Sequence, residues 1–278
     1  MLSRTMLVVS LVVLAAAPAQ AGRGASYGAM RNAIWSGSAD AIKAELERGE
    51  TVVCPACVDL VMPLVDHEDA SVRQVAAWWL SRRGVRTDVM NQMIARLSDV
   101  DSQKARNAAD VLGEFQRVDA ILPLGTALGN RTFSPEARVH VARALGTIGD
   151  VRAQPSLQQG LGAPEPEVRA AALAALRALR GFGSGEVAVP LLTDADESVR
   201  VQAIYTVGLV RSGAGVSALT GLLAGDASVN VRKKAAWALG EIGAAARSAA
   251  PALQAAASSD ASPLVRSLAQ AALGRLNR

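Results

Sequence analysis

A ten-residue phrase recurs along most of this 278-residue chain, and the repetition constrains the fold more than any other feature. The phrase reads Val-Arg-x-x-Ala-Ala-x-Ala-Leu-Gly, and its clearest copy occupies residues 231–240. Six further copies stand at residues 72–81, 104–113, 137–146, 168–177, 199–208 and 265–274. Successive copies are 31 to 34 residues apart. A fixed period of this size predicts a solenoid, in which each unit buries its apolar face only by stacking on its neighbours.

Each unit is expected to be a pair of antiparallel helices. In the sixth unit the first helix is predicted at residues 216–224 and the second at 229–242, where apolar residues recur at helical spacing and Gly243 follows as a helix stop. The other first helices are predicted at residues 89–97, 120–128, 153–160, 187–192 and 249–257. The predicted fold is therefore an all-α, right-handed α-solenoid of about seven antiparallel helix pairs.

The part of the chain before the phrases is predicted to cover the open end of this stack. Residues 22–65 lack the phrase but contain three helix-like stretches, at 29–35, 39–46 and 56–64, and are assigned to an N-terminal helical cap. Residues 66–278 are assigned to the repeat solenoid. Half of the residues are hydrophobic but only 3% are aromatic, which suits thin layers of helices packed on small side chains.

Residues 1–21 are interpreted as a secretory signal peptide. Arg4 gives a positive start, residues 6–17 form an apolar run, and Ala19-Gln20-Ala21 fits a cleavage site. The run is short for a membrane span, and a retained N-terminal anchor is the alternative. No later stretch reaches membrane length without charges or turn residues. We therefore expect an exported mature protein without a membrane span, which in a Gram-negative host means the periplasm.

The mature chain is only mildly basic. Without Arg4 it holds 28 Lys and Arg against 25 Asp and Glu, a net charge of +3. These charges are interspersed and form no basic block, whereas a surface that binds nucleic acid needs a basic stripe. The charge pattern therefore argues against a nucleic-acid partner.

One Arg occupies the second position of the phrase in six of the seven copies, and we call it the frame Arg. The frame Arg residues are Arg73, Arg138, Arg169, Arg200, Arg232 and Arg266. Asp residues recur in the turns before the second helices, among them Asp194, Asp226 and Asp260. A frame Arg can reach the turn of its own or the next unit, so we predict a ladder of Arg–Asp contacts that holds the units in register.

From residue 66 to residue 278 the chain resembles the HEAT-repeat family, and most closely its short phycobilisome-lyase-like branch. The resemblance rests on the seven phrases and on their preceding Asp turns. It implies that the second helices line the concave side of the stack. Scaffolds, adaptors and a few enzymes share this fold, so the resemblance says less about function. The bilin lyases of this branch act inside the cell, in conflict with export; an auxiliary role in cofactor loading is kept as one alternative.

A further comparison, with deoxyhypusine hydroxylase, argues against a di-iron enzyme. That HEAT-like family implies His-Glu pairs directly after the opening Arg of several units, and none of the units here has one. The pair His67-Glu68 lies in a predicted turn, where helix capping is the better interpretation. No nucleophile elbow stands out among the serines. We expect no enzyme activity, no catalytic residues, no metal and no cofactor.

The motif Cys54-Pro55-Ala56-Cys57 has chemistry of its own. Two close cysteines in an exported protein favour a disulfide. Pro55 just inside a helix start would place Cys54 near the positive end of the helix. That position lowers the pKa of a thiol, as in redox-active pairs. Covalent haem attachment needs His where Val58 stands, and zinc needs ligands that a chain with two Cys does not supply. A structural disulfide and a redox-active one both remain open.

The best functional feature is a stripe of variable positions one, five and nine residues after each frame position, which share one face of the second helices. The stripe residues assigned to binding are Trp78, Arg106, Asp110, Arg143, Tyr205, Lys233, Trp237 and Glu241. Trp, Tyr and Arg are common anchors of protein interfaces, although the rings can instead pack on the next unit. We expect an exported scaffold that binds a protein or peptide on its concave face. The alternative is a redox-linked protein that exchanges with a client through Cys54 and Cys57.

Overall fold

The computed structural model describes residues 26–276, and within that range it contains helices and no β-strand. No helix between these limits is long and apolar enough to span a membrane. The predicted signal peptide, residues 1–21, lies outside the described residues.

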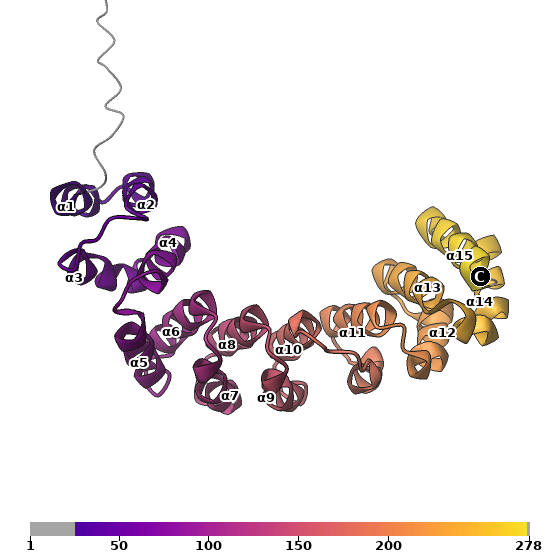
Figure 1. Cartoon of the computed structure of the whole chain (residues 1–278). Coiled ribbons are helices and arrows are strands. Elements are labelled where there is room, and N and C mark those ends of the chain that lie inside the picture. Colours follow the sequence, from indigo (N-terminus) through magenta and orange to yellow (C-terminus); the bar gives the residue numbers. More distant parts are fainter. Residues whose placement is uncertain (1–25, 277–278) are drawn as a thin grey trace, which may run out of the picture.

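Seven helix pairs follow one another in a curved row (Figure 1). The second helix of each pair lies in an inner row on the concave side, and the first element lies in an outer row on the convex side. We call the second helices the inner helices. The pairs, outer element first, are η1 (Met62–Asp66) with α4 (Ala70–Ser81), α5 (Arg86–Arg96) with α6 (Ser102–Phe115), α7 (Ile121–Gly129) with α8 (Pro135–Ile148), α9 (Gln154–Gly160) with α10 (Pro166–Ala178), η4 (Glu186–Thr193) with α11 (Glu197–Leu209), α12 (Val216–Gly225) with α13 (Val229–Ile242), and α14 (Ala250–Ser259) with α15 (Pro263–Leu276).

The predicted α-solenoid of helix pairs is confirmed, and the one inner helix whose bounds were predicted matches them. Helix α13 spans Val229–Ile242 as expected. The fifth outer element differs, because η4 is a 3-10 helix with Pro190 inside it, whereas the sequence predicted a regular helix at 187–192. Proline has no N–H to donate and its ring crowds the preceding turn, so it disfavours an α-helix there. Short 3-10 turns lead into other outer helices, namely η2 (Val118–Ala120), η3 (Val151–Ala153), η5 (Gly213–Gly215) and η6 (Gly243–Ala249).

Most inner helices begin at a polar capping residue. The side chain of this residue accepts a backbone N–H of the first turn, which otherwise has no partner in the helix. The capping residues are Asp69, Asp101, Ser134, Asp196 and Ser228. The turns before the inner helices are therefore fixed locally, before any contact between units is made.

The N-terminal part consists of α1 (Tyr27–Trp35), α2 (Ala39–Arg48) and α3 (Cys57–Val61) and packs on the first unit. Two side chains of the first unit hold the end of α2. The indole Nε1 of Trp79 donates to the carbonyl of Gly49 at 3.2 Å, and the guanidinium of Arg83 donates to the carbonyls of Gly49 and Glu50 at 2.6 Å each. Trp79 is fully buried beneath that guanidinium.

Neighbouring inner helices approach so closely that a side chain at the last position of the phrase has no room. A Cβ built on Gly146 would lie 2.9 Å from the Cα of Ala175 in the next inner helix. The same glycine position faces the same alanine position at three other junctions, Gly113 with Ala144, Gly208 with Ala238 and Gly240 with Ala272. The Gly of the phrase is therefore a packing residue between units.

The junction between α10 and α11 departs from this pattern. Arg177 stands at the glycine position and Thr206 at the facing alanine position. The Arg177 Nη1 donates to the Thr206 hydroxyl at 3.0 Å, and its Nη2 donates to the Gln202 side chain at 2.6 Å. Burial lowers the pKa of the Arg177 guanidinium. The buried apolar residues also divide into two clusters here, one ending at Leu179 and the other continuing from Leu173 to Leu276.

The glycine contact gives a stability prediction. Gly146→Ala should lower the free energy of unfolding by about 1–3 kcal/mol, because the added methyl group meets backbone atoms of the next helix. Gly274 is the matched control, since it holds the same phrase position in the last unit and nothing lies within 4 Å of its built Cβ. Gly274→Ala should leave stability unchanged or raise it by up to about 1 kcal/mol through helix propensity. Urea unfolding followed by circular dichroism measures both, and an equal effect at the two positions would contradict the packing role.

Candidate functional site

All of the stripe residues assigned to binding lie on inner helices, and none of them is buried. The stripe changes in character along the row. Its first part is polar and charged over α4, α6 and α8, its middle consists of alanines on α10, and its last part is aromatic and basic over α11 and α13.

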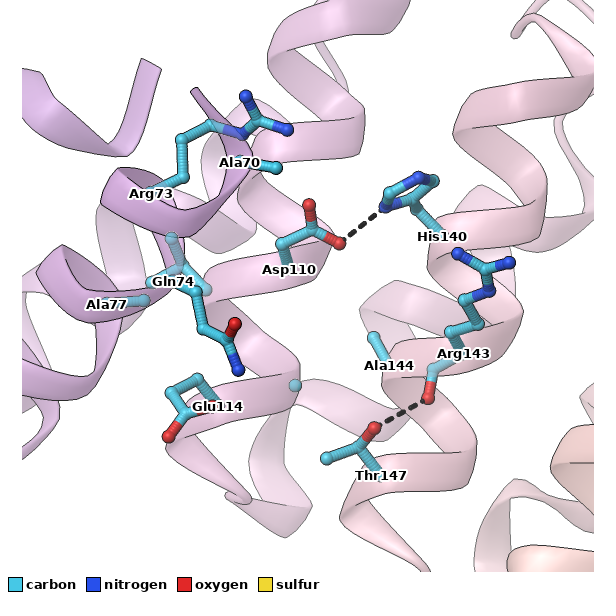
Figure 2. Close-up of a pocket in the computed structure, with 12 residues that line it drawn as sticks. Ala70, Arg73, Gln74, Ala77, Asp110, Glu114, His140, Arg143, Ala144 and Thr147 are labelled. Carbon is cyan, nitrogen blue, oxygen red and sulfur yellow. Dashed lines mark hydrogen bonds and ion pairs between the residues drawn. The ribbon is translucent and has the colours of Figure 1, made fainter. Parts of the chain in front are cut away.

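The polar part of the stripe surrounds a pocket of about 260 Å³ between α4, α6 and α8 (Figure 2). Arg73 and Gln74 line it from α4, Asp110 from α6, and His140 and Arg143 from α8. The Nδ1 of His140 lies 2.6 Å from Oδ1 of Asp110, so these two side chains fix each other across the groove between their helices.

Sequence reasoning missed two members of this pocket. The sequence analysis assigned His140 to no site and Arg73 only to the ladder of Arg–Asp contacts. His140 directly follows the stripe position Val139, so a stripe two residues wide would have included it. No group of His, Cys, Asp and Glu that could hold a metal ion occurs between residues 26 and 276.

Arg106 is part of a network of side chains rather than a free binding group. Its Nη1 lies 2.6 Å from Glu136 Oε1 in the next unit, and its other nitrogens donate to the Asn107 side chain. The Asn107 amide donates in turn to Asp66 at 3.0 Å. The hydrogen bond from Arg106 holds the pKa of the Glu136 carboxyl below its ordinary value, with the charge of Arg106 acting in the same direction.

The aromatic part of the stripe is built by two rings from neighbouring units. The ring centroids of Tyr205 and Trp237 are 5.2 Å apart and their planes are tilted by 54°. The Trp237 ring also reaches the Gly208 position on α11, and the Lys234 ammonium lies 4.2 Å from the centroid of the Tyr205 ring. Both rings stay partly exposed, and Leu209 beside them is 59% exposed. Trp237 therefore packs on its neighbour and still presents surface to the groove.

The remaining stripe residues differ in how far they are engaged. The Arg82 guanidinium lies 5.0 Å from the centroid of the Trp78 ring, which is partly exposed. Glu241 forms an ion pair with Arg275 in the next unit. Arg143 and Lys233 have no ion-pair partner among residues 26–276, so they are the charges of the stripe that are most available to a ligand.

Three frame Arg residues form the Arg–Asp contacts between consecutive units. In each, Nε and Nη2 donate to the two carboxylate oxygens of the Asp in the next turn, and Nη1 donates to two carbonyls of the Arg's own turn. The pairs, with the shortest N–O distance, are Arg169–Asp194 at 2.8 Å, Arg200–Asp226 at 2.9 Å and Arg232–Asp260 at 2.8 Å. A bidentate pair fixes both distance and orientation, so these contacts set the register of the last units.

The ladder does not extend over every frame Arg, and for three of the six the predicted Arg–Asp contact between units is wrong. Arg138 contacts Glu165 at 2.6 Å in place of an Asp. Arg266 and Arg73 donate only to carbonyls of their own turns. Arg266 belongs to the last described unit, so no further turn follows it in residues 26–276. Arg73 does have a following unit, and its ion-pair partner is nevertheless missing.

The cysteine motif forms a disulfide between Cys54 and Cys57. Cys57 is fully buried and Cys54 is partly exposed. Helix α3 begins at Cys57, so the expected placement of Pro55 inside a helix start is wrong, and Cys57 rather than Cys54 stands at the first turn. The reason is that Cys54, Pro55 and Ala56 form a turn, in which the N–H of Cys57 donates to the carbonyl of Cys54 at 3.1 Å.

His67 takes the place of a turn Asp. Its Nδ1 accepts the N–H of Asp69 at 3.0 Å, as Asp226 Oδ1 accepts the N–H of Ser228 at 2.8 Å. Asp69 then caps α4. His67 thus lies in a turn, as predicted, but the predicted helix-capping role is wrong, because the side chain of Asp69 caps α4.

Comparisons with known proteins agree on the fold. A family model for HEAT repeats matches residues 90–177 and 185–274. A designed armadillo repeat protein in complex with peptide (KR)4 is 24% identical, with a TM-score of 0.51, covering 68% of this chain and 99% of that one. The Escherichia coli protein YibA is 17% identical, with a TM-score of 0.54 and 91% of both chains covered. The phycocyanin lyase CpcE–CpcF complex from Nostoc sp. PCC7120 is 24% identical over 79% of this chain and 94% of its own, but its TM-score of 0.43 carries no argument. No curated protein sequence matches significantly.

The ladder predicts a loss of stability in acid. The hydrogen bond from Arg232 holds the pKa of the Asp260 carboxyl below its ordinary value, although burial opposes this. The pair therefore contributes fully above the ordinary carboxyl pKa of about 4, and its contribution is lost as the pH falls through the lowered value. Asp260→Asn should cost about 2 kcal/mol near neutral pH and make the decline in acid shallower.

Thermal unfolding followed between pH 7 and pH 2 measures this effect. Asp88→Asn is the control, because Asp88 is exposed on α5 and has no ion pair in the described part of the chain. Equal acid profiles for wild type and Asp260→Asn would show that the ladder does not contribute to the acid dependence.

Proposed function

Because the chain belongs to the HEAT-repeat family, we propose that it is a non-enzymatic scaffold that binds a protein or peptide along its concave face. The observation that carries this proposal is the stripe itself, whose inner helices present the exposed Arg143, the partly exposed Lys233 and a partly exposed aromatic pair at Tyr205 and Trp237. Arg, Tyr and Trp side chains supply much of the binding energy of protein interfaces. The designed armadillo protein of similar fold is itself in complex with a peptide.

The rigidity of the inner row supports the same proposal. Inner helices joined through glycine contacts and bidentate ion pairs form the groove before any ligand arrives. A preformed groove loses little conformational entropy on binding, so a short peptide segment suffices as a partner. Extended surfaces of this kind are the usual binding surfaces of solenoid proteins.

A scaffold role also fits the chemistry of the pocket. Asp110 and His140 resemble part of a catalytic set, but the hydroxyl that lines the same pocket belongs to Thr147, and it donates to the carbonyl of Arg143 at 3.0 Å. This hydroxyl is engaged with its own helix and is not activated by the imidazole. We therefore assign no catalytic residue.

The proposal predicts that the stripe is needed for partner capture. The variant with Trp78, Arg143, Tyr205 and Trp237 changed to Ala should bind its partner on the order of 100-fold more weakly, because these exposed and partly exposed side chains are the proposed anchors of the groove. Its helix content should be retained, since none of the four is fully buried. Affinity capture from the host's cell envelope, beside wild type, measures the effect.

A control variant changes two large exposed side chains outside the stripe, Trp35 on α1 and Leu122 on α7, to Ala. It should capture the partner as well as wild type does. Partners captured equally by the stripe variant would refute the concave-face proposal. A client trapped by Cys57→Ser and released by reduction would favour redox exchange, and a coloured ligand retained on purification would favour cofactor loading.

We also propose that the protein is exported after removal of residues 1–21. This predicts that protein purified from its own host begins at Gly22, because cleavage after Ala21 removes the apolar run. Intact mass and N-terminal sequencing of the envelope fraction measure this directly. Recovery of the full chain, with Met1 present, would support a retained anchor or an intracellular protein.

A further inference from the structure

The aromatic part of the stripe forms an apolar patch on the inner helices α11 and α13. Tyr205 and Leu209 lie one helical turn apart on the same face of α11. Trp237 packs on Tyr205 from α13, with the ring centroids 5.2 Å apart. Both rings are partly exposed, and Leu209 is 59% exposed. We call Tyr205, Leu209 and Trp237 the aromatic patch, because together they offer apolar surface that an apolar side chain of a ligand can cover.

Two lysines beside the aromatic patch give it positive charge. Lys233 is partly exposed and lies one turn before Trp237 on the same face of α13. The ammonium of Lys234 lies 4.2 Å from the centroid of the Tyr205 ring and donates to the hydroxyl of that ring. Neither ammonium forms an ion pair with a carboxylate among residues 26–276. The two lysines therefore leave positive charge that a ligand can balance.

The carboxylates nearest in sequence to the patch already have partners in the protein. Glu241 lies one turn beyond Trp237 and pairs with Arg275 in the next unit. Glu197, at the start of α11, accepts the hydroxyl of Ser228 at 2.7 Å. The charge left over beside the aromatic patch is thus positive. An acidic ligand complements it, in contrast to the basic (KR)4 peptide of the designed armadillo protein.

The spacing of these groups limits how far the acidic residue can stand from the apolar one. Lys233 and Trp237 are four residues apart on a helix, which places them about 6 Å apart along its axis. An extended peptide advances about 3.3 Å per residue. A carboxylate one or two residues from the apolar side chain therefore reaches Lys233 while that side chain covers the patch.

We propose that the aromatic patch and Lys233 bind an apolar side chain that has an acidic residue within two positions of it in the peptide. The apolar side chain covers Tyr205, Leu209 and Trp237, and the carboxylate pairs with the Lys233 ammonium. The inference rests on the proposed function, because it names the chemistry of the ligand at one part of the concave face.

The test uses four blocked pentapeptides as probes on the full chain. Acetyl-Glu-Glu-Phe-Glu-Glu-amide is the acidic probe, and Gln or Lys in place of Glu gives the neutral and the basic probe. In the fourth, the ringless probe, Ala replaces Phe and the glutamates remain. Glutamates on both sides of the ring test both directions of the peptide and both spacings at once.

The indole N–H resonances of the ¹⁵N-labelled protein report where a probe binds. The Trp237 resonance, assigned by its loss in Trp237→Phe, should shift with the acidic probe at millimolar concentration. The neutral probe should bind about threefold more weakly and the basic probe more weakly still, because an exposed ion pair contributes little more than that. The ringless probe should leave the resonance unchanged. Trp79, which is fully buried, and Trp35, which lies on α1, are internal controls whose resonances should not move.

Two variants separate the charge from the apolar contact. Lys233→Gln should lower the affinity for the acidic probe to that for the neutral one, while Lys104→Gln, which makes the same charge change at an exposed position on α6, should not. Leu209→Ala should weaken the acidic and the neutral probe alike, about threefold, because it removes apolar surface. Leu122→Ala, at an exposed position on α7, should weaken neither.

Four results would overturn the proposal. They are a Trp237 shift with the ringless probe equal to that with the acidic one, neutral or basic probes that bind as tightly as the acidic one, unchanged preference for the acidic probe in Lys233→Gln, and no shift of Trp237 with any probe. Probe binding at Trp237 with partner capture that does not depend on the stripe would support the subsite and refute the concave-face scaffold. Stripe-dependent capture without a shift at Trp237 would do the reverse.

Discussion

The contact between a glycine of one inner helix and an alanine of the next sets the spacing of the inner helices at four of the six junctions. With only a hydrogen atom at Gly146, the backbone of the neighbouring helix comes to a distance that a Cβ would not permit. The outer row, made of short helices and 3-10 turns, has no equivalent series of glycines. An inner row drawn together in this way is shorter than the outer row, so the stack bends toward it (Figure 1). The concave groove therefore depends on the glycine at the last position of the phrase.

The bidentate Arg–Asp pairs restrict the sliding of neighbouring units, which the glycine contacts do not. Glycine contacts bring two helices together but allow them to slide, whereas a guanidinium that holds both oxygens of Asp226 and two carbonyls of its own turn permits one register only. Where the second unit has its Arg one position late, Asn107 and Glu136 replace the pair, and in the first unit the Nε of Arg73 has no hydrogen-bond partner among the described residues.

The sequence predicted the fold well because the repeat phrase contains the residues that make it: the buried apolar positions, the capping turns and the inner-helix bounds such as Val229–Ile242. It predicted the site less well. None of the stripe residues assigned to binding is buried, but the partners of Arg106 and Asp110 come from the next inner helix, and a phrase read one unit at a time does not show them. The sequence did not show that Arg73 lacks an Asp partner, for the same reason. Asp99 is present in the sequence, but in the structure it contacts Asp101 and Lys104.

The junction at Arg177 has a mechanical consequence. Because each unit touches only its neighbours, bending of the stack concentrates at the junction where the inner helices pack least closely. At the α10–α11 junction a long polar side chain and Thr206 replace the glycine–alanine contact, and the apolar core divides there. The units before α11 and the units from α11 onward should therefore move as two rigid groups, with the change in angle between them at this junction. The spacing between the charged pocket and the aromatic pair would then adjust to the length of whatever lies between them.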